Sequence, residues 1–212
     1  MIDLYFIEYD HTMSNDVLCK LKLQLPNNVI SKCPQYKRIE NIQEFLLGKS
    51  LLLYALYHHG YSINLLENIK YNFYGKPTID GVFFNISHTR NCVVCAFSIT
   101  ENIGVDIEKK RFIQKSIYQD NMNEIGNDSS FLKYWTVKEA VLKNIGVGLS
   151  LWDNIKIDYG KHQAEFKSEK FFFRNIDAFD NYFITISSSV IPRDVNIHVL
   201  QLSDIIFNMV YN

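Results

Sequence analysis

The order in which strand-like and helix-like segments follow one another most constrains the fold of this chain. Leucines and aromatic residues at helical spacing predict a buried helix at residues 41–59 and an amphipathic helix at residues 131–145. Gly146 and Gly148 are typical helix stops and end the second helix. Apolar runs between polar turns predict strands at residues 2–9, 82–86, 92–97, 103–107, 154–159, 163–166, 171–175, 182–187 and 195–200.

Strands, one long helix, strands, a second long helix and more strands predict an α+β protein made of two similar halves. The break between the halves is expected near residues 98–102. This gives an N-terminal subdomain at residues 1–101 and a C-terminal subdomain at residues 102–212. Residues 116–130 are polar and rich in Asn and Asp, which predicts a loop or a weak helix there.

The composition and the apolar pattern argue against two classes of protein. A formal net charge of -1 is unlike the basic surface of a general nucleic-acid binder. The longest apolar stretch, residues 45–57, is interrupted by polar residues and is too short to span a bilayer. The acidic first strand is also unlike a signal peptide. We therefore expect a soluble cytoplasmic protein that binds neither nucleic acid nor membranes.

Cys92 and Cys95 have the CxxC spacing of metal and redox sites, but their context does not suit either role. They lie in a predicted strand, where residues three apart point to opposite faces. A second CxxC pair, which a structural zinc site would need, is missing from the sequence. Both are expected to be buried free thiols.

Asp106 lies at the end of the predicted strand at residues 103–107, and Glu108 follows that strand directly. The two lie two residues apart, so both side chains leave the same face. Two neighbouring carboxylates repel each other and need a cation, a shared proton or full solvation. Oxygen ligands of this kind suit Mg²⁺. The alternative is a solvated strand end, neutralised by the three basic residues that follow: Lys109, Lys110 and Arg111.

Glu139 lies on the predicted second helix, four residues after Trp135 and four before Lys143, so that the three share one face. Phe131 lies on the same face. A charged side chain in line with Phe and Trp is unusual if the stripe is only core. The alternative is an ordinary Glu–Lys surface pair, which contributes a few tenths of a kcal/mol.

Several residues in the first half suit a phosphate group. Ser87 and His88 follow the strand at residues 82–86 and can donate hydrogen bonds, and Lys76 offers a charge on a loop that Pro77 makes rigid. His88 could equally be a turn residue bonded to the backbone. The sequence contains no GxSxG, GxxxxGK[ST] or GxGxxG pattern. An N-terminal basic group consists of Lys32, Lys37 and Arg38.

Taken in order, these segments resemble the surfactin-synthetase-activating type of 4′-phosphopantetheinyl transferase. The match is densest between residues 74 and 150, and several motifs in the same order are more specific than any one of them. The motifs are Tyr74-Gly75-Lys76-Pro77, Phe84-Asn85-Ile86-Ser87-His88, Gly104-Val105-Asp106-Ile107-Glu108, Trp135-Thr136-Val137-Lys138-Glu139-Ala140 with Lys143, and Gly148-Leu149-Ser150.

The resemblance implies a monomer with pseudo-two-fold symmetry and coenzyme A bound between the halves. The first subdomain would contact the coenzyme A phosphates, and the second would carry the metal-binding carboxylates. The implied metal ligands are Asp106, Glu108 and Glu139. The implied catalytic residues are Asp106, Glu139 and Lys143. The implied coenzyme A contacts are Lys76, Ser87, His88 (near the 3′-phosphate), Lys32, Lys37, Arg38 and Lys143 (at the pyrophosphate).

The activity that the resemblance implies is that of a holo-[acyl carrier protein] synthase. The serine of an apo acyl or peptidyl carrier protein attacks the pyrophosphate of coenzyme A, takes up 4′-phosphopantetheine and releases 3′,5′-ADP. Mg²⁺ or Mn²⁺ would neutralise the developing charge. The carrier could belong to fatty-acid, polyketide or nonribosomal peptide biosynthesis. Two alternatives stay open: a non-catalytic module that binds carriers or coenzyme A, and a metal-dependent phosphohydrolase.

The chain departs from the family pattern in two places. Relatives carry a basic residue just before the Leu-Leu-Gly of the first long helix, where this chain has Glu44. Lys49 or the N-terminal basic group could replace that phosphate contact. The segment between Glu108 and Trp135 is short, so the usual glutamate base has no clear counterpart. Glu124 is one candidate, and Glu139 could serve as both metal ligand and base.

The same segment would offer a docking surface for the carrier protein. Its apolar residues could either form this surface or belong to the core of a short helix. They are Phe112, Ile113, Ile117, Tyr118 and Met122.

Overall fold

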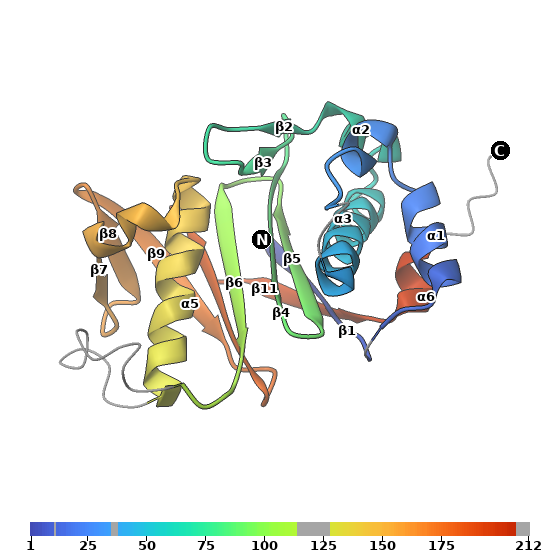
Figure 1. The fold of residues 1–212 in the computed structure, drawn as a ribbon. Coiled ribbons are helices and arrows are strands. Elements are labelled where there is room, and N and C mark those ends of the chain that lie inside the picture. Colours follow the sequence, from blue (N-terminus) through green and yellow to red (C-terminus); the bar gives the residue numbers. More distant parts are fainter. Residues whose placement is uncertain (11, 35–37, 114–127, 207–212) are drawn as a thin grey trace.

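Two β-sheets and two long helices build the fold (Figure 1). The structure is a computed structural model that describes residues 1–10, 12–34, 38–113 and 128–206. The first sheet has the strand order β11-β1-β5-β4. Its strands are β1 (Ile2–Glu8), β4 (Phe83–Thr89), β5 (Cys92–Ser98) and β11 (Val195–Leu200). Strands β1, β5 and β4 pair antiparallel, whereas β11 pairs parallel with β1.

The second sheet is antiparallel throughout and has the strand order β6-β10-β9-β8-β7. Its strands are β6 (Ile103–Lys109), β7 (Ile155–Asp158), β8 (Gln163–Phe166), β9 (Glu169–Ile176) and β10 (Tyr182–Ser188). A short hairpin of β2 (Lys70–Tyr71) and β3 (Pro77–Thr78) stands apart from both sheets. In Figure 1 this hairpin lies above β4 and β5.

One long helix covers each sheet: α3 (Ile39–His58) packs on the first, and α5 (Asp128–Ile145) packs on the second. The smaller helices α1 and α6 gather around α3 (Figure 1). The shorter elements are α1 (Asn15–Leu23), α2 (Asn27–Ile30), α6 (Leu202–Ile205) and the 3₁₀ helices η1 (Ile63–Asn68) and η4 (Leu149–Asn154).

Strand alternation divides the apolar residues between separate cores. On β5, Val93, Cys95 and Phe97 face α3, while Cys92, Val94 and Ala96 face a core shared by both sheets. On β6, the odd-numbered residues from Ile103 to Ile107 enter this shared core. Residues 104, 106 and 108 therefore face α5, because neighbouring residues of a strand point to opposite sides.

Gly104 lets α5 approach β6 more closely than any other residue would allow. A Cβ atom at this position would lie 2.0 Å from the backbone oxygen of Ala140 and 2.4 Å from the backbone nitrogen of Asn144. Both atoms belong to the backbone of α5, which cannot turn aside as a flexible side chain can. The close approach brings residues 139 and 143 of the helix near residue 106 of the strand.

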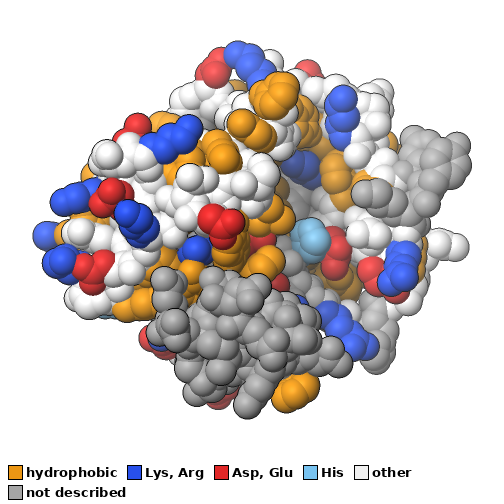
Figure 2. All heavy atoms as spheres, turned by 60° about the vertical axis from the view of Figure 1, so that its left-hand side comes forward, with side chains coloured by type: hydrophobic (Ala, Val, Ile, Leu, Met, Phe, Trp, Pro, Cys, Tyr) orange, Lys and Arg blue, Asp and Glu red, His pale blue; other side chains and the backbone are white. Residues whose placement is uncertain are grey.

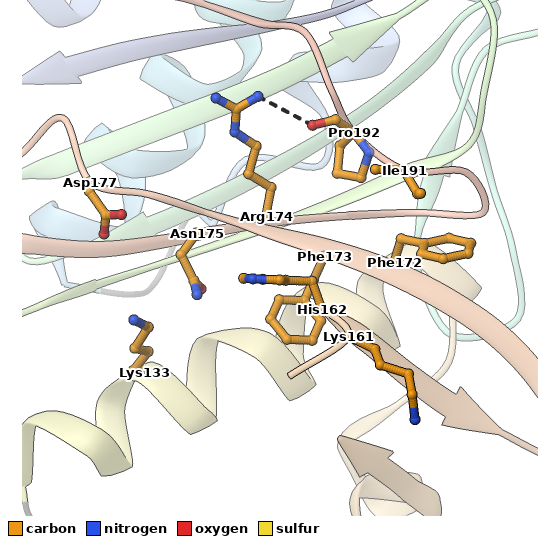
Figure 3. Close-up of a pocket in the computed structure, with 10 residues that line it drawn as sticks. All are labelled: Lys133, Lys161, His162, Phe172, Phe173, Arg174, Asn175, Asp177, Ile191 and Pro192. Atoms are coloured by element: carbon orange, nitrogen blue, oxygen red, sulfur yellow. Dashed lines mark hydrogen bonds between the residues drawn. The ribbon is translucent and has the colours of Figure 1, made fainter. Parts of the chain in front are cut away.

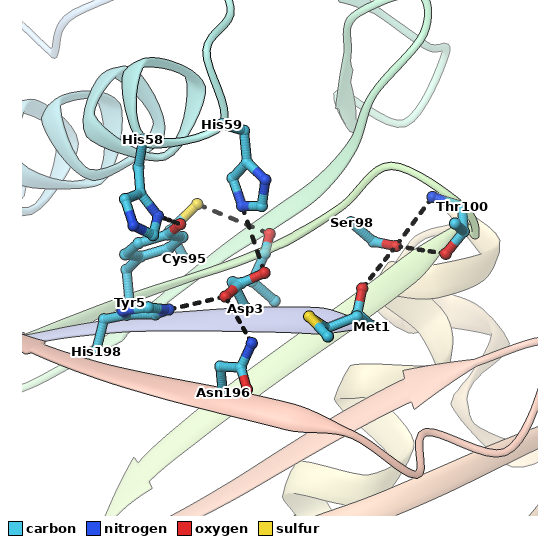
Figure 4. A network of polar contacts seen from close by, with 11 residues as sticks. Met1, Asp3, Tyr5, His58, His59, Cys95, Ser98, Thr100, Asn196 and His198 are labelled. Carbon is cyan, nitrogen blue, oxygen red and sulfur yellow. Dashed lines mark hydrogen bonds and ion pairs between the residues drawn. The ribbon is translucent and has the colours of Figure 1, made fainter.

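A polar network links β11 to β1 within the first sheet (Figure 4). The carboxylate of Asp3 on β1 lies 2.8 Å from Nε2 of His198, 3.2 Å from Nδ2 of Asn196 and 3.3 Å from Nε2 of His59. Burial acts to raise the pKa of Asp3, but the hydrogen bonds from His198 and Asn196 and the nearby His59 lower it below its usual value. The network thus joins β1, β11 and the end of α3.

The α+β class expected from the sequence is confirmed, and each long helix lies within three residues of its predicted position at both ends. Strand β4 extends to Thr89, three residues beyond the predicted end, so Ser87 and His88 lie within a strand. The division at residues 101 and 102 stays a prediction. The sheets follow it except at β11, which crosses back to β1.

The predicted free thiols are confirmed: the structure describes all four cysteines as free, with Cys92 and Cys95 buried. The two lie in different cores, on opposite faces of β5. Burial raises the pKa of Cys95 to about 12. Among the described helices, none combines the length and apolar character that a bilayer crossing requires.

Replacing Gly104 by Ala should force α5 away from β6. We expect the free energy of unfolding to fall by about 3 kcal/mol, at the upper end of the usual cost of overpacking a core. Urea denaturation measures this change. Gly160→Ala is the control, because the nearest atom to its added Cβ lies at an ordinary 3.5 Å. Equal stability of the Gly104 variant and the parent would contradict the close approach.

Candidate active site

The site lies where the edge strands of the two sheets meet, at β4 and β6. An edge strand leaves backbone N–H groups without partners, and side chains of β4 accept two of them here. Oδ1 of Asn85 accepts from the backbone nitrogen of Val105 at 2.9 Å, and Oγ1 of Thr89 accepts from that of Lys109 at 3.2 Å. Ser87 lies between these residues on the same face of β4 and so points at the middle of β6.

Asp106 is the centre of the polar cluster that Ser87 meets. Its Oδ1 accepts hydrogen bonds from Ser87 Oγ at 2.8 Å and from Lys143 Nζ at 2.6 Å. Lys143 also donates to Ser87 Oγ at 3.0 Å. Asp106 is only 4% exposed, so the Lys143 ammonium balances a carboxylate that is almost removed from water.

Glu139 approaches the same ammonium, with Oε2 lying 3.6 Å from Lys143 Nζ. Burial would lower the pKa of Lys143, but Asp106 and Glu139 together raise it, so the lysine is charged. Burial raises the pKa of Glu139, and the neighbouring Asp106 adds to this, although Lys143 opposes it. One ammonium thus serves two carboxylates, which leaves the cluster able to attract a further positive charge.

The predicted stripe on α5 divides into an apolar part and a polar part. Trp135 packs on Trp152 with ring centroids 4.6 Å apart, and Phe131 lies beside it in the same apolar cluster. Lys138 is buried and lies over the ring of Trp152 at 5.1 Å. The apolar part thus fixes the helix on the second sheet, and Glu139 and Lys143 are left facing β6. The surface-pair alternative for Glu139 does not describe this arrangement.

His88 follows Ser87 directly but faces the other way, toward α3. Its Nδ1 lies 3.3 Å from Oε2 of Glu44. Desolvation lowers the pKa of His88, and Lys143 adds to this effect. Burial raises the pKa of Glu44, and nearby Glu40 adds to it. Both shifts favour the neutral forms, so this contact is not a strong salt bridge.

A cleft of about 570 Å³ opens between α3, β4 and the β2–β3 hairpin. Figure 2 shows one face of the molecule, hollowed between its two halves, with a histidine and acidic side chains at the hollow. Two lysines line the cleft, Lys32 and Lys49, and burial lowers the pKa of Lys49 to about 8. The cleft is lined by Lys32, Pro34, Asn41, Glu44, Phe45, Gly48, Lys49, Tyr71, Gly75, Pro77, Asn85, Ile86 and His88.

The remaining predicted residues are scattered. The ammonium of Lys76 turns away from the cleft and donates to oxygens of Asn102, Ile103 and Asn144. Arg38 is exposed at the start of α3. In the predicted docking surface, Phe112 is exposed and Ile113 is buried against α5. Four predicted residues lie outside the described part of the chain, as does the candidate base: Lys37, Ile117, Tyr118, Met122 and Glu124.

The predicted metal ligands partly suit a divalent cation. Oδ2 of Asp106 is buried without a hydrogen-bond partner among the described residues, and carboxylates are ligands that Mg²⁺ prefers. As they stand, however, no three His, Cys, Asp or Glu side chains in the described ranges are placed to hold a metal. Lys143 lies between Asp106 and Glu139, and Arg111 binds Glu108 at 2.6 Å. The metal site stays a prediction that requires these cations to move.

A second hollow of about 390 Å³ lies between α5 and β9 (Figure 3). Lys133 reaches toward it from α5, and the ring of His162 lies against Phe173. The guanidinium of Arg174 donates to the backbone oxygen of Pro192. None of the predicted site residues belongs to its described lining.

Sequence reasoning missed the polar residues that hold the site together. It named Asn85 only as part of a motif, although Asn85 bonds to the backbone of β6. It did not single out Asn72, Asn102 or Asn144, which meet at the end of α5. Asparagine next to a predicted strand or helix end was the available signal, because its side chain can bond to free backbone groups.

Comparisons with known proteins identify relatives of this chain. The model of the 4′-phosphopantetheinyl transferase superfamily matches residues 102–187, which include β6, α5 and all of β10 but its last residue. The 4′-phosphopantetheinyl transferase gsp of Aneurinibacillus migulanus is 30% identical over 167 residues, covering 70% of this chain and 68% of the relative. The 4′-phosphopantetheinyl transferase Sfp of Bacillus subtilis (strain 168) is 30% identical over 164 residues, which cover 70% of this chain and 72% of the relative. HetI of Nostoc sp. is 27% identical over 177 residues, covering 74% and 73%.

The matches to gsp and Sfp, each 30% identical and covered over more than two thirds of its length, show that the chain belongs to the 4′-phosphopantetheinyl transferase superfamily.

Proposed function

We propose that this protein transfers the 4′-phosphopantetheine group of coenzyme A to a serine of an apo carrier protein and releases 3′,5′-ADP. One structural observation carries the proposal beyond family membership. Ser87 and His88 are consecutive on β4, yet Ser87 contacts the Asp106–Lys143 cluster and His88 lines the cleft. A nucleotide in the cleft would therefore have its pyrophosphate next to the charged cluster.

The cleft suits the nucleotide end of coenzyme A. Its volume of about 570 Å³ falls in the usual range for small-molecule sites. Lys32, Lys49 and His88 offer cationic or hydrogen-bonding groups for phosphate, whereas Glu44 opposes it. We place the 3′-phosphate beside His88 and the pyrophosphate between Ser87 and Lys143, with the pantetheine arm leading out toward the carrier.

In this arrangement the residues of the cluster have separate tasks. Lys143, held charged by Asp106 and Glu139, neutralises the pyrophosphate oxygens as the P–O bond to 3′,5′-ADP breaks. Ser87 Oγ donates to a phosphate oxygen in place of Asp106. The carrier serine oxygen forms the new P–O bond and loses its proton. Glu139, whose pKa is raised, is our choice for the acceptor of that proton.

A divalent cation, Mg²⁺ or Mn²⁺, would supply further charge neutralisation at the pyrophosphate if Asp106, Glu108 and Glu139 hold it. In that case Arg111 must release Glu108. Acyl and peptidyl carrier proteins are both proposed as acceptors. A monomeric state and a cytoplasmic location stay predictions from the sequence.

The proposal is tested by incubating the protein with coenzyme A, Mg²⁺ and a panel of apo carrier proteins. Mass spectrometry should show the pantetheine mass increment on at least one carrier, and chromatography should show an equal amount of 3′,5′-ADP. Coenzyme A binding without transfer to any carrier would favour a non-catalytic module. Release of nucleotide or phosphate without a carrier would favour a phosphohydrolase.

Asp106→Asn should lower kcat/KM for transfer by about a hundredfold or more, because Lys143 loses its closest charge and the pyrophosphate site loses its order. Asn is preferred to Ala because it keeps the shape of a buried side chain and can still accept from Ser87. Transfer rates are measured over a range of Mg²⁺ concentrations. Asp80→Asn, at an exposed carboxylate paired with Lys70, is the control. An unchanged rate and Mg²⁺ dependence would remove Asp106 from the site.

Glu44→Gln should tighten the binding of coenzyme A by up to about fivefold, the equivalent of ~1 kcal/mol for a partly exposed charge contact. The Glu44 carboxylate faces His88. Because we place the 3′-phosphate beside His88, the carboxylate would repel that phosphate. Because the pKa of Glu44 is raised, this repulsion grows with rising pH as the carboxyl ionises. Calorimetry with coenzyme A and with dephospho-coenzyme A measures the effect. A gain of equal size for both donors would show that Glu44 does not face the 3′-phosphate.

A further inference from the structure

The loop of the β2–β3 hairpin lies between the cleft and the end of α5. On one side, Tyr71, Gly75 and Pro77 line the cleft. On the other side, the loop covers the last turn of the helix that carries Glu139 and Lys143. Nδ2 of Asn72 donates to the backbone oxygen of Gly146, just beyond the end of α5, at 2.8 Å.

Lys76 forms the centre of this contact. Its Nζ lies 2.9 Å from the backbone oxygen of Asn144, 2.9 Å from Oδ1 of Asn102 and 3.4 Å from the backbone oxygen of Ile103. A lysine ammonium has three N–H donors, and these three oxygens take all of them in the described structure. Lys76 therefore has no donor left for a phosphate, contrary to what the resemblance implied.

Residues of the β2–β3 loop and of the end of α5 pack closely around this contact. Asn102 Nδ2 donates to the same backbone oxygen of Asn144 at 2.6 Å. Gly146 has a φ angle of +80°, and a Cβ there would lie 2.9 Å from Asn72 Nδ2 and 3.0 Å from Cδ of Lys76. Cations that bond to the free carbonyls at the end of a helix are favourable, because these carbonyls carry partial negative charge.

We propose that Lys76 is a positioning residue. It holds the last turn of α5 against the β2–β3 loop beside the cleft and against β6, and so keeps the Lys143 ammonium in contact with Asp106 and Ser87. Lys143 immediately precedes Asn144, whose carbonyl Lys76 binds, so a shift of this turn moves the Lys143 ammonium directly. The inference rests on the proposed function, since it assigns Lys143 to the pyrophosphate.

Lys76→Met tests the proposal. We expect kcat for transfer to fall on the order of tenfold to a hundredfold, as for a small misplacement of a catalytic group, while KM and Kd for coenzyme A change less than about threefold. Lys76→Arg should recover much of kcat, because a guanidinium can still bond to the carbonyls. Lys70→Met is the matched control on the same hairpin, since Lys70 pairs only with exposed Asp80 among its described contacts.

A loss confined to the affinity for coenzyme A, with kcat unchanged, would overturn the proposal and show that Lys76 binds coenzyme A instead. If Lys76→Met does not fold, Asn102→Ala removes two hydrogen bonds of the same contact, one from Lys76 Nζ and one to the backbone oxygen of Asn144. This variant should likewise lower kcat much more than it changes KM. Hydrogen exchange of the amides at residues 142–146 should rise in either variant, and unchanged exchange would also overturn the proposal.

The pH profile gives a second test. Burial alone lowers the pKa of Lys76 to about 8, and its three partners at Asn102, Ile103 and Asn144 are uncharged. The Lys76 ammonium is therefore charged below this pH and loses its charge as the pH rises through about 8. The parent kcat should decline there, and Lys76→Arg should not show this decline, because a guanidinium stays charged. An identical decline in both proteins would contradict the claim that kcat depends on the positive charge of residue 76.

The outcomes separate this inference from the proposed function. A parent protein that transfers nothing to any carrier would refute the proposed function, and hydrogen exchange would still report whether Lys76 holds α5. A parent that transfers the group, with Lys76→Met equally fast, would refute only the positioning role.

Discussion

The contact between β4 and β6 is the constraint on which the rest of the structure depends. Two sheets normally end in edges whose free N–H groups face water, but here Asn85 and Thr89 accept such groups across the gap. Their spacing leaves Ser87 between them, aimed at Asp106. Neither half of the chain contains the whole cluster, so joining these edges is also what assembles the chemistry.

The cluster itself keeps a charge imbalance in a place largely removed from water. Lys143 contacts two carboxylates, and one oxygen of Asp106 has no partner among the described residues. Such an arrangement costs stability, because burying charges without full pairing is unfavourable. It is suited to a ligand that brings its own anions and cations, as a pyrophosphate with a bound metal does. A structural role would be better served by apolar residues.

Periodicity was enough to predict the class of fold, the two long helices and the facing of Asp106 and Glu139, because these follow from local patterns. It failed where the outcome depends on distant partners. Strand β4 continues through Thr89 because β5 pairs with it along its full length, and this sends Ser87 and His88 to opposite sides. Lys76 matched a motif, yet its ammonium binds the carbonyl of Asn144, 68 residues away. Helix α1 was missed although Ser14 caps its start.

The parallel pairing of β1 with β11 also governs how the chain can fold as it is synthesised. Asp3 and His198, which bond across this pair, are 195 residues apart. On the ribosome, β1 must wait with one edge open until the residues of β11, Val195–Leu200, have emerged, and closing so distant a contact is slow. Open strand edges invite association with other chains. Nascent chains of this protein should therefore depend on chaperones for longer than their early helices alone would suggest.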